Sequence, residues 1–326
     1  MRPFRGLALC RLMALLRTRG LDGRRRVAAM VLGSLLAAGL VLAGDQVAVD
    51  AERYSAYADP EKPVISFLLS DPENVEDFQR EFALDDDEME DVLAAVRREN
   101  EALAGSLSES EEIIRSNRGL PDGRIAEKIE ASSYDEKVRA AVARSKGEVK
   151  GIVTPDLRPD IGAWVDARWQ AEREEFNEDP DVYRSASKAG RGKSFRVFAT
   201  QYRGHTRREV ALPHRKLKFR GGYEVGIRPE GSRKRTRAKV KEIGPWNTYD
   251  NWWARQENRD MWRKLRRGKP QAQAAYFNNF NRGRDEFGRK VLNPGGVDLT
   301  PRVARAVGLR RYENAWVYVR MPWVRR

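Results

Sequence analysis

The spacing of apolar residues divides the chain into a helical part and a part made of strands. Between residues 60 and 177 apolar side chains recur every three or four positions, as on one face of an amphipathic helix. Two such sets are Leu84, Met89, Val92, Leu93 and Val96, and Ile161, Trp164, Val165 and Trp169. Acidic residues at 85–87 suit the first turn of a helix, and Ser133 suits an N-cap. We predict an acidic helical region over residues 60–177, and we find no motif for chemistry in it.

From residue 195 the apolar runs become shorter and are separated by glycine, proline and basic residues, which indicates strands. The predicted strands cover residues 195–200, 223–227, 238–243 and 315–319. One short helix is predicted among them, with Thr300 as N-cap, Pro301 in the first turn and Gly308 at the end. The polar segment 178–194, which contains glycine and serine, is predicted to be a linker between the two parts.

An apolar segment near the N-terminus indicates export. Residues 27–43 contain no charged residue, three arginines stand directly before them, and acidic residues follow. This segment is short for a membrane-spanning helix and long for the apolar core of a signal peptide. The positive charge in front of it places everything downstream outside the cytoplasm. We predict that residues 1–43 are either a cleaved signal peptide or a membrane anchor.

Charge is distributed unevenly along the chain, whose net charge is +14. Residues 44–183 contain 17 Lys and Arg against 36 Asp and Glu, whereas residues 184–326 contain 37 against 11. A basic C-terminal part suits an anionic polymer, and nucleic acid, teichoic-type polymers and peptidoglycan all fit. Since an exported protein rarely meets nucleic acid in a functional way, we expect a wall polymer and no nucleic acid.

The chain is poor in residues that bind metals or act as thiol nucleophiles. Its one cysteine, Cys10, precedes the apolar segment, so a form cleaved after residue 43 would contain none. The two histidines are His205 and His214, and the carboxylates show no spacing typical of metal ligands. We expect neither a metal nor another cofactor.

Three segments carry a resemblance to one known family. They are residues 211–219 (ALPHRKLKF), 240–246 (VKEIGPW) and 297–309 (VDLTPRVARAVGL). They resemble a segment Ala-Ala-His-x-x-Leu-Pro-Phe-Gly-Thr, a strand that ends in Asp-Arg-Gly-Pro-Phe, and an Ile-Asp-Leu-Ser segment followed by a short helix. In that order, these segments are typical of the double-psi β-barrel of the rare-lipoprotein-A (RlpA-like) lytic transglycosylases, to which the expansins are more distantly similar. The resemblance covers residues 195–322.

The resemblance implies an α+β protein, in which a helical region is followed by a six-stranded double-psi β-barrel at 195–326 with a long insertion at 247–295. It also implies two catalytic carboxyls. Glu242 stands where the family has an aspartate and would protonate the leaving sugar. Asp298 matches the family directly; since it precedes a helix N-terminus, we expect its ionised form to be favoured, so that it stabilises positive charge on the sugar. A further acid of the family has no counterpart here.

The insertion is rich in aromatic and asparagine residues, which suits the binding of sugars. Aromatic faces stack on pyranose rings, and side-chain amides bond hydroxyl groups. We expect some of the aromatics to form the insertion's own core, and Trp246 with one of Trp252 or Trp253 to be exposed. The predicted substrate-binding residues are Trp246, Asn247, Trp252, Trp253 and His214.

The sequence therefore predicts a protein of the cell envelope, secreted or anchored by residues 27–43, that acts on peptidoglycan or another anionic wall polysaccharide. Two interpretations of the barrel stay open: a lytic transglycosylase, which is a lyase, and an expansin-like module that binds glycan strands without cleaving them. A third interpretation places the function in the helical region, through a protein partner, with the barrel as an anchor.

Overall fold

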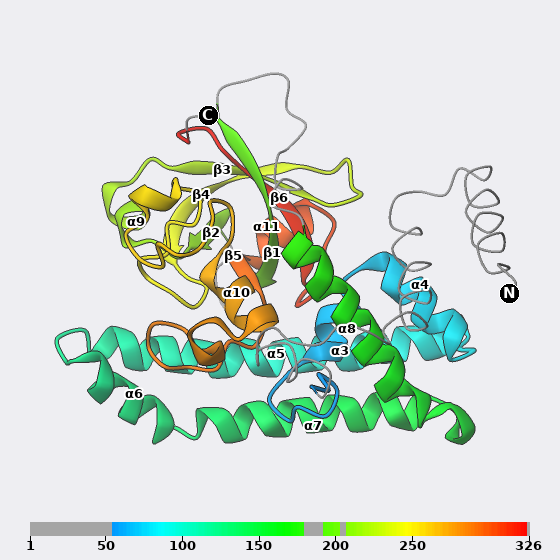
Figure 1. Cartoon of the computed structure of the whole chain (residues 1–326). Coiled ribbons are helices and arrows are strands. Elements are labelled where there is room, and N and C mark those ends of the chain that lie inside the picture. The colour runs from blue at the N-terminus through cyan, green and yellow to red at the C-terminus, as the bar shows by residue number, and fades with distance from the viewer. Residues whose placement is uncertain (1–53, 179–191, 203–206, 325–326) are drawn as a thin grey trace, which may run out of the picture. The chain divides into compact units, whose positions relative to one another are not determined.

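The computed structural model of the chain describes residues 54–178, 192–202 and 207–324 (Figure 1). From Ser55 onward they belong to one compact unit, Ser55–Arg326. The apolar segment 27–43 and most of the linker predicted at 178–194 lie outside the described residues. Within the described ranges, no helix combines the length and the apolar character needed to cross a membrane.

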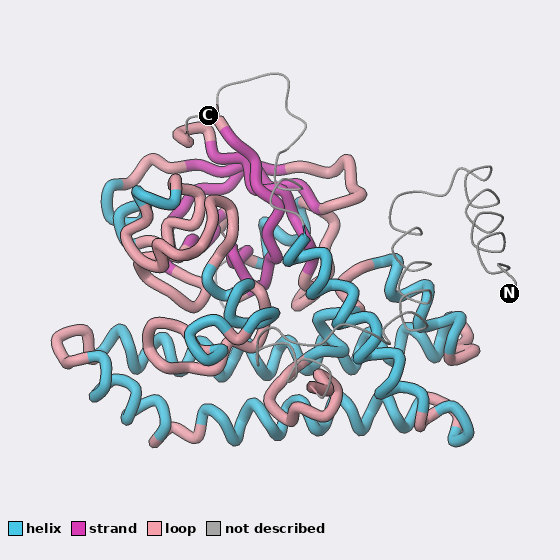
Figure 2. Tube along the Cα trace, viewed as in Figure 1, coloured by secondary structure: helices cyan, strands magenta, loops and turns pink. Residues whose placement is uncertain are grey.

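The N-terminal part of this unit is helical, as Figure 2 shows. Its elements are α3 Val64–Leu68, α4 Pro72–Glu81, α5 Asp86–Ser116, α6 Asp122–Glu130, α7 Tyr134–Ile152, the 3₁₀ turn η2 Pro155–Leu157 and α8 Asp160–Glu178. The long helix α5 begins with a capping box: Asp85 accepts from the backbone N of Glu88 at 2.8 Å, and the Glu88 carboxylate accepts from the backbone N of Asp85 at 3.0 Å. The predicted helical region is confirmed.

The C-terminal part contains a closed six-stranded barrel. Its strands are β1 Lys193–Gln201, β2 Glu209–Leu212, β3 Glu224–Pro229, β4 Thr236–Ile243, β5 Gly295–Leu299 and β6 Ala315–Met321, and they pair in the order β1-β5-β2-β4-β3-β6. The pairs β1/β5 and β2/β4 are parallel and the others antiparallel. If β1, β2 and β3 change places with β4, β5 and β6, the strand order and the pairing directions stay the same. This twofold repeat is the internal symmetry of a double-psi barrel. The predicted α+β fold class is confirmed.

The insertion between β4 and β5 contains η3 Gln256–Asn258, α10 Gln271–Asn278 and η4 Phe280–Gly283. It lies directly on the barrel: a Cβ on Gly296 of β5 would approach Pro270 Cγ to 2.8 Å and Val197 Cβ to 3.0 Å, so only glycine fits there. Two further helices, α9 Arg215–Arg220 and α11 Pro301–Ala306, follow β2 and β5. The start of α11 at Thr300 and Pro301 is confirmed, although the Thr300 hydroxyl donates to Arg207 O at 2.7 Å and does not cap the helix.

Two apolar cores hold the unit together. One fills the barrel and includes Trp252 and Trp253 of the insertion. The other joins the helices to the outside of the barrel, with Phe67 of α3 at its centre. The Phe67 ring centroid lies 5.4 Å from that of Phe198 on β1 and 5.2 Å from that of Tyr276 on α10. Because burying a large apolar side chain stabilises the folded state by about 1.5–3 kcal/mol, this second core fixes the helices against the barrel.

Candidate functional site

A cleft of about 1060 Å³ opens between helix α5 and the barrel. Its lining comes from the C-terminal half of α5 and the chain from there through the start of α6, from the strands β2, β4 and β5, from α9, from Tyr202 after β1, and from the insertion. Six acidic side chains line it, namely Glu111, Glu112, Asp122, Glu242, Glu286 and Asp298. The two catalytic residues predicted from the sequence therefore line one cleft, together with four carboxyls that were not predicted.

The sheet register brings Glu242 and Asp298 to the same side of the barrel. Glu242 on β4 pairs with Ala211 on β2, and Ala211 pairs with Asp298 on β5. Laterally paired residues point to the same face of a sheet, and two strand spacings separate their Cα atoms by about 10 Å. Since the residue between the two acids is an alanine, the space above it stays open to the cleft.

Asp298 is buried in the floor of the cleft. The Thr200 hydroxyl on β1 donates a hydrogen bond to its Oδ1. Burial raises the pKa of Asp298 to about 6, although the Thr200 bond and the charge of Arg289 act in the opposite direction. The sequence analysis expected the helix N-terminus to favour the ionised form. That expectation is wrong in direction, because the loss of solvent outweighs the dipole of a six-residue helix.

Glu242 has the more polar surroundings of the two predicted acids. Its side chain is 30% exposed, and its Oε2 lies 2.6 Å from Nζ of Lys218 on α9. Of the two predicted acids, Asp298 is thus the more buried one, whereas the sequence analysis assigned the protonating role to Glu242.

A third carboxyl comes from the helical region, where no chemistry was predicted. Glu111 lies near the C-terminal end of α5 and lines the cleft. A Cβ placed on Gly244 would lie 3.6 Å from Oε1 of Glu111 and 3.4 Å from Oδ2 of Asp298, so both carboxyls border the space beside Gly244. Although the residue as a whole is partly exposed, desolvation of the carboxyl raises the pKa of Glu111 to about 7, against the attraction of Arg289.

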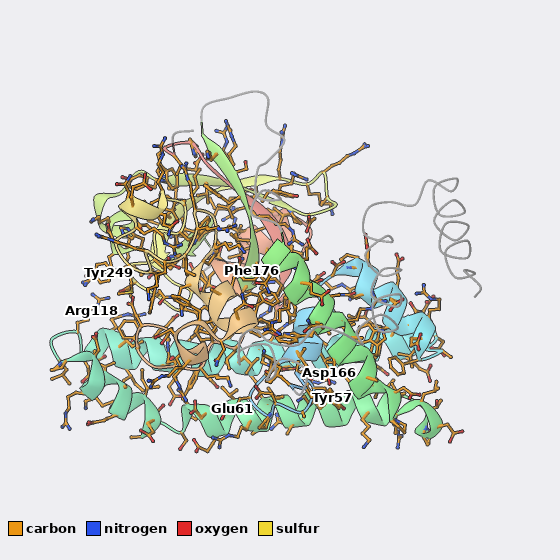
Figure 3. The ribbon with its side chains drawn as sticks, in the orientation of Figure 1. Tyr57, Glu61, Arg118, Asp166, Phe176 and Tyr249 are labelled. Atoms are coloured by element: carbon orange, nitrogen blue, oxygen red, sulfur yellow. The ribbon has the colours of Figure 1, made fainter. Side chains whose placement is uncertain are left out.

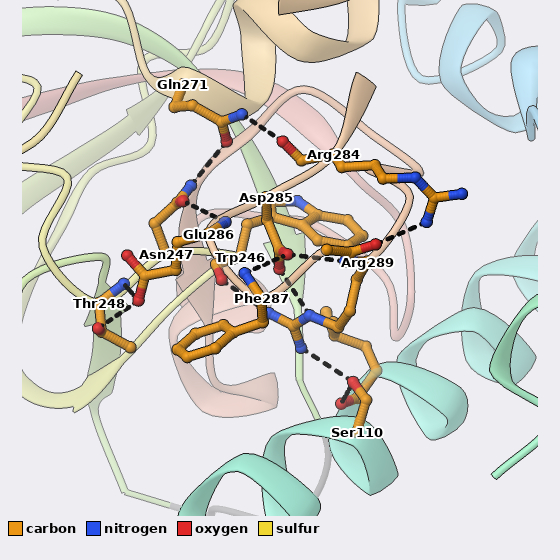
Figure 4. A network of polar contacts seen from close by, with 12 residues as sticks. Ser110, Trp246, Asn247, Thr248, Gln271, Arg284, Asp285, Glu286, Phe287 and Arg289 are labelled. Atoms are coloured by element: carbon orange, nitrogen blue, oxygen red, sulfur yellow. Dashed lines mark hydrogen bonds and ion pairs between the residues drawn. The ribbon is translucent and has the colours of Figure 1, made fainter. Parts of the chain in front are cut away.

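A buried arginine joins the helix, the insertion and the cleft (Figure 4). Arg289 donates from Nε to Asp285 Oδ2 at 2.6 Å, from Nη1 to Ser110 Oγ at 2.9 Å, and from Nη2 to Trp246 O at 2.7 Å. Its side chain and that of Asp285 are almost wholly buried. Ser110 precedes Glu111 on α5, so the same network that holds the insertion in place also fixes the part of α5 that faces the cleft.

Glu286, next to this network, is another carboxyl of the cleft. It accepts from the backbone N of Thr248 at 2.9 Å and from the Thr248 hydroxyl. Burial raises the pKa of Glu286 to about 7. No described residue hydrogen-bonds to its buried Oε2 atom.

The predicted sugar-binding tryptophans are buried. The exposed fractions of Trp246, Trp252 and Trp253 are 2%, 0% and 7%. The Trp252 indole donates to Gly296 O at 3.2 Å and its ring meets the edge of Phe195, so it belongs to the barrel core. The expectation that Trp246 and one of the other two are exposed is wrong, because the insertion uses these large rings to cover the barrel. Trp246 still borders the cleft, whereas Trp252 and Trp253 do not line it.

Asn247 and His214 are also buried and hydrogen-bonded. Asn247 Nδ2 donates to Gln271 Oε1 at 2.8 Å, and the residue lines the cleft. His214 Nε2 lies 2.9 Å from Asp260 Oδ2, outside the cleft lining, and desolvation lowers the pKa of His214 despite this acidic neighbour. Their predicted role in binding substrate stays a prediction; only Asn247 is placed to reach the cleft.

The accessible rim of the cleft carries cations and aromatic side chains. Tyr249, 37% exposed, and Arg118 both line it, and Figure 3 shows them along the same edge of the molecule. Arg215 donates to the Tyr249 hydroxyl at 2.8 Å, and the partly exposed Trp262 completes the aromatic surface. Within the described ranges, no group of three or more His, Cys, Asp or Glu side chains is placed to hold a metal ion.

Comparison with known families gives one match. Residues 193–320 match the model of a family described as a domain of unknown function (DUF8814), which is less than half of the chain. The match runs from the start of β1 into β6, so it contains the barrel and its insertion but not α5 with Glu111. No curated protein and no solved structure is significantly similar to the chain.

Proposed function

We propose that the cleft binds a cell-wall glycan, with peptidoglycan as the substrate, and cleaves it without water, as the RlpA-like lytic transglycosylases do. The observation that carries this proposal is the buried carboxyl of Asp298 in the floor of an open cleft, with Glu242 and Glu111 beside it. Cleavage of a glycosidic bond needs a carboxyl that holds a proton near neutral pH. Burial raises the pKa of Asp298 to about 6, close enough to neutral pH for the carboxyl to exchange a proton during the reaction.

The proposed reaction transfers a glycosyl group within one sugar chain. The bond from C1 to the leaving oxygen breaks while that oxygen receives a proton from a carboxylic acid. The 6-hydroxyl of the same sugar forms a bond to C1 and releases its proton to a carboxylate, which closes an anhydro ring. Atoms and protons balance without water, oxidant or reductant.

The surroundings of the two barrel acids indicate which one exchanges protons and which one stabilises positive charge. Asp298 exchanges protons at the reaction centre, because its site is desolvated. Glu242, paired with Lys218, supplies negative charge against the positive charge that develops on the sugar ring. A cleft of about 1060 Å³ is at the upper end of the range for small-molecule sites and offers room for more than one sugar.

Binding without cleavage, as in the expansins, is the second candidate. It is favoured by the rim, where Arg118, Arg215 and Tyr249 offer cationic and aromatic contacts that need no acid. Either function requires a place outside the cytoplasm, where the protein would be secreted or anchored through residues 27–43. A protein partner of the helical region would be compatible with both.

Digestion of purified sacculi by the full-length protein, followed by mass spectrometry of the soluble products, tests the proposal. We expect anhydro-muropeptides from the wild type and roughly 10²- to 10⁴-fold less from Asp298→Asn, because the group that exchanges protons is lost. Asp156→Asn, an exposed residue outside the cleft lining, is the matched control and should behave as the wild type. Co-sedimentation with sacculi and no products would favour binding alone, and the absence of both would contradict the proposal.

A further inference from the structure

We infer that Glu111 of helix α5 is a second catalytic carboxyl, which borders the same space beside Gly244 as Asp298 and divides the proton transfers of the reaction with it. The inference rests on the proposed function and deepens it. It also gives the helical region a direct part in the chemistry, whereas the sequence analysis found no motif for chemistry there and considered only a protein partner.

The geometry at Gly244 carries the inference. A side chain there would begin 3.4 Å from Asp298 Oδ2 and 3.6 Å from Glu111 Oε1, so the two oxygens approach the same point. Gly244 has φ +142°, a conformation that residues with a side chain rarely adopt, and the space between the acids therefore stays free. Both acids also border a second cavity of about 30 Å³, behind the cleft.

Charged side chains from α5, the insertion and the barrel surround Glu111. Two cations face it, Arg115 on α5 and Arg289 in the insertion, and two further acids, Asp298 and Glu242, come from the barrel. The hydroxyls of Tyr134, at the start of α7, and Tyr202, after β1, lie within electrostatic range of Glu111. Two carboxyls in one desolvated site repel when both are ionised, so the pair retains one proton to a higher pH than an isolated acid.

Dividing the proton transfers suits both halves of the reaction. Glu111, whose pKa burial raises to about 7, gives its proton to the leaving oxygen, while Asp298, raised to about 6, takes the proton of the 6-hydroxyl. After the products leave, Asp298 releases its proton to the solvent of the open cleft and Glu111 takes up a proton from it, so both groups are ready for another turnover. Because burial raises both pKa values toward neutrality, Glu111 can hold a proton while Asp298 is ionised close to neutral pH.

The helix is held firmly enough to place Glu111. Ser110, the residue before it, is fully buried and accepts a hydrogen bond from Arg289 at 2.9 Å. Arg289 in turn is fixed by Asp285 and by the carbonyl of Trp246. A catalytic group on a regular helix with such support keeps its position better than one on a loop.

The test compares Glu111→Gln with Glu109→Gln in the full-length protein. Glu109 is an exposed acid on the same helix, paired with Lys137 at 2.7 Å and outside the cleft lining. We expect Glu111→Gln to lower the release of anhydro-muropeptides from sacculi by roughly 10²- to 10³-fold and to keep sedimentation with sacculi. Glu109→Gln should match the wild type, and Glu111→Asp should restore part of the rate.

The dependence of the rate on pH separates a catalytic from a structural role. The wild-type rate should rise near pH 6 and fall near pH 7, and Glu111→Gln should lose the fall on the alkaline side. Product release by Glu111→Gln within two-fold of the wild type would overturn the inference and leave the proposed function standing. If the wild type itself releases nothing, the proposed function fails and the inference with it. Should Glu111→Gln not fold, a wild-type rate that is constant from pH 5.5 to 8 overturns the inference.

Discussion

The insertion and helix α5 both contain desolvated carboxyl groups, but they differ in whether these groups form ion pairs. In the insertion, Asp285 is paired with Arg289 and Asp250 with Arg259, and all four side chains are almost wholly buried. On α5, Glu99 and Glu111 form no ion pair with another described residue, and burial raises the pKa of each to about 7. Paired charges hold a loop in one shape, whereas an unpaired acid in a desolvated site keeps a proton and can exchange it. The insertion therefore holds Asp250 and Asp285 in ion pairs, with Glu286 as its exception, whereas Glu99 and Glu111 of α5 both lack an ion pair with another described residue.

The largest expected effect comes from breaking a pair in the insertion. Arg289→Met should lower the free energy of unfolding by about 3–5 kcal/mol, because it leaves the buried Asp285 carboxylate without its cation. Denaturant unfolding measures the loss, and Arg302→Met, an exposed arginine on α11, is the control. Replacing both partners, in Asp285→Asn with Arg289→Met, should recover part of the loss. A single variant as stable as the wild type would show that the pair does not hold the insertion.

An intermediate effect is expected from Glu99, the structural acid of α5. Its pKa is raised by burial from about 4.5 to about 7, so the folded state keeps a proton that the unfolded chain releases. The resulting stabilisation is complete below pH 4.5 and is lost as the pH rises through 7. We expect Glu99→Gln to remove on the order of 2–3 kcal/mol of the decrease in stability between pH 5 and 8. Thermal unfolding across this range, with Glu101→Gln on the same helix as control, would show an unchanged slope if Glu99 were ionised throughout.

The smallest effect concerns the rim on the α5 side. Arg118 is exposed and forms no ion pair or hydrogen bond with another described residue, so its charge is available to an anionic glycan. Arg118→Glu should weaken sedimentation with sacculi by a few fold, and the difference should shrink at high salt. Arg124→Glu makes the same charge change on α6 outside the cleft lining. Equal effects of the two variants would mean that only net charge matters.

The helical region and four of the six strands could be predicted because local periodicity specifies them. The two missed strands, β2 and β5, have four and five residues, and all five residues of β5 are buried, so no alternation marks it. Asp298 and Glu242 could be found because each stands in a recognisable segment beside a turn or a helix cap. The raised pKa of Asp298 could not be predicted, since it depends on what covers the carboxyl.

For a related reason, the sequence could not predict that Glu111 lines the cleft or that the tryptophans are buried. Glu111 stands in the acidic run 109–112, which is typical of a solvated helix face, and only the tertiary fold places it opposite Gly244. The aromatic composition of the insertion suits a sugar site and a core equally well. Which rings remain accessible depends on the surface that the insertion covers. The exposed ring, Tyr249, was not among the predicted substrate-binding residues.

The aromatic cluster around Phe67 has a consequence for how the chain can be divided. Phe198 and Trp316 of the barrel and Tyr276 of the insertion lie within the matched segment 193–320, but the ring that they surround belongs to α3. Excising that segment would leave a continuous aromatic patch open to water, which favours aggregation. We therefore expect the matched segment 193–320 not to be soluble alone. The boundaries of the family match differ from those of the unit that folds together, Ser55–Arg326.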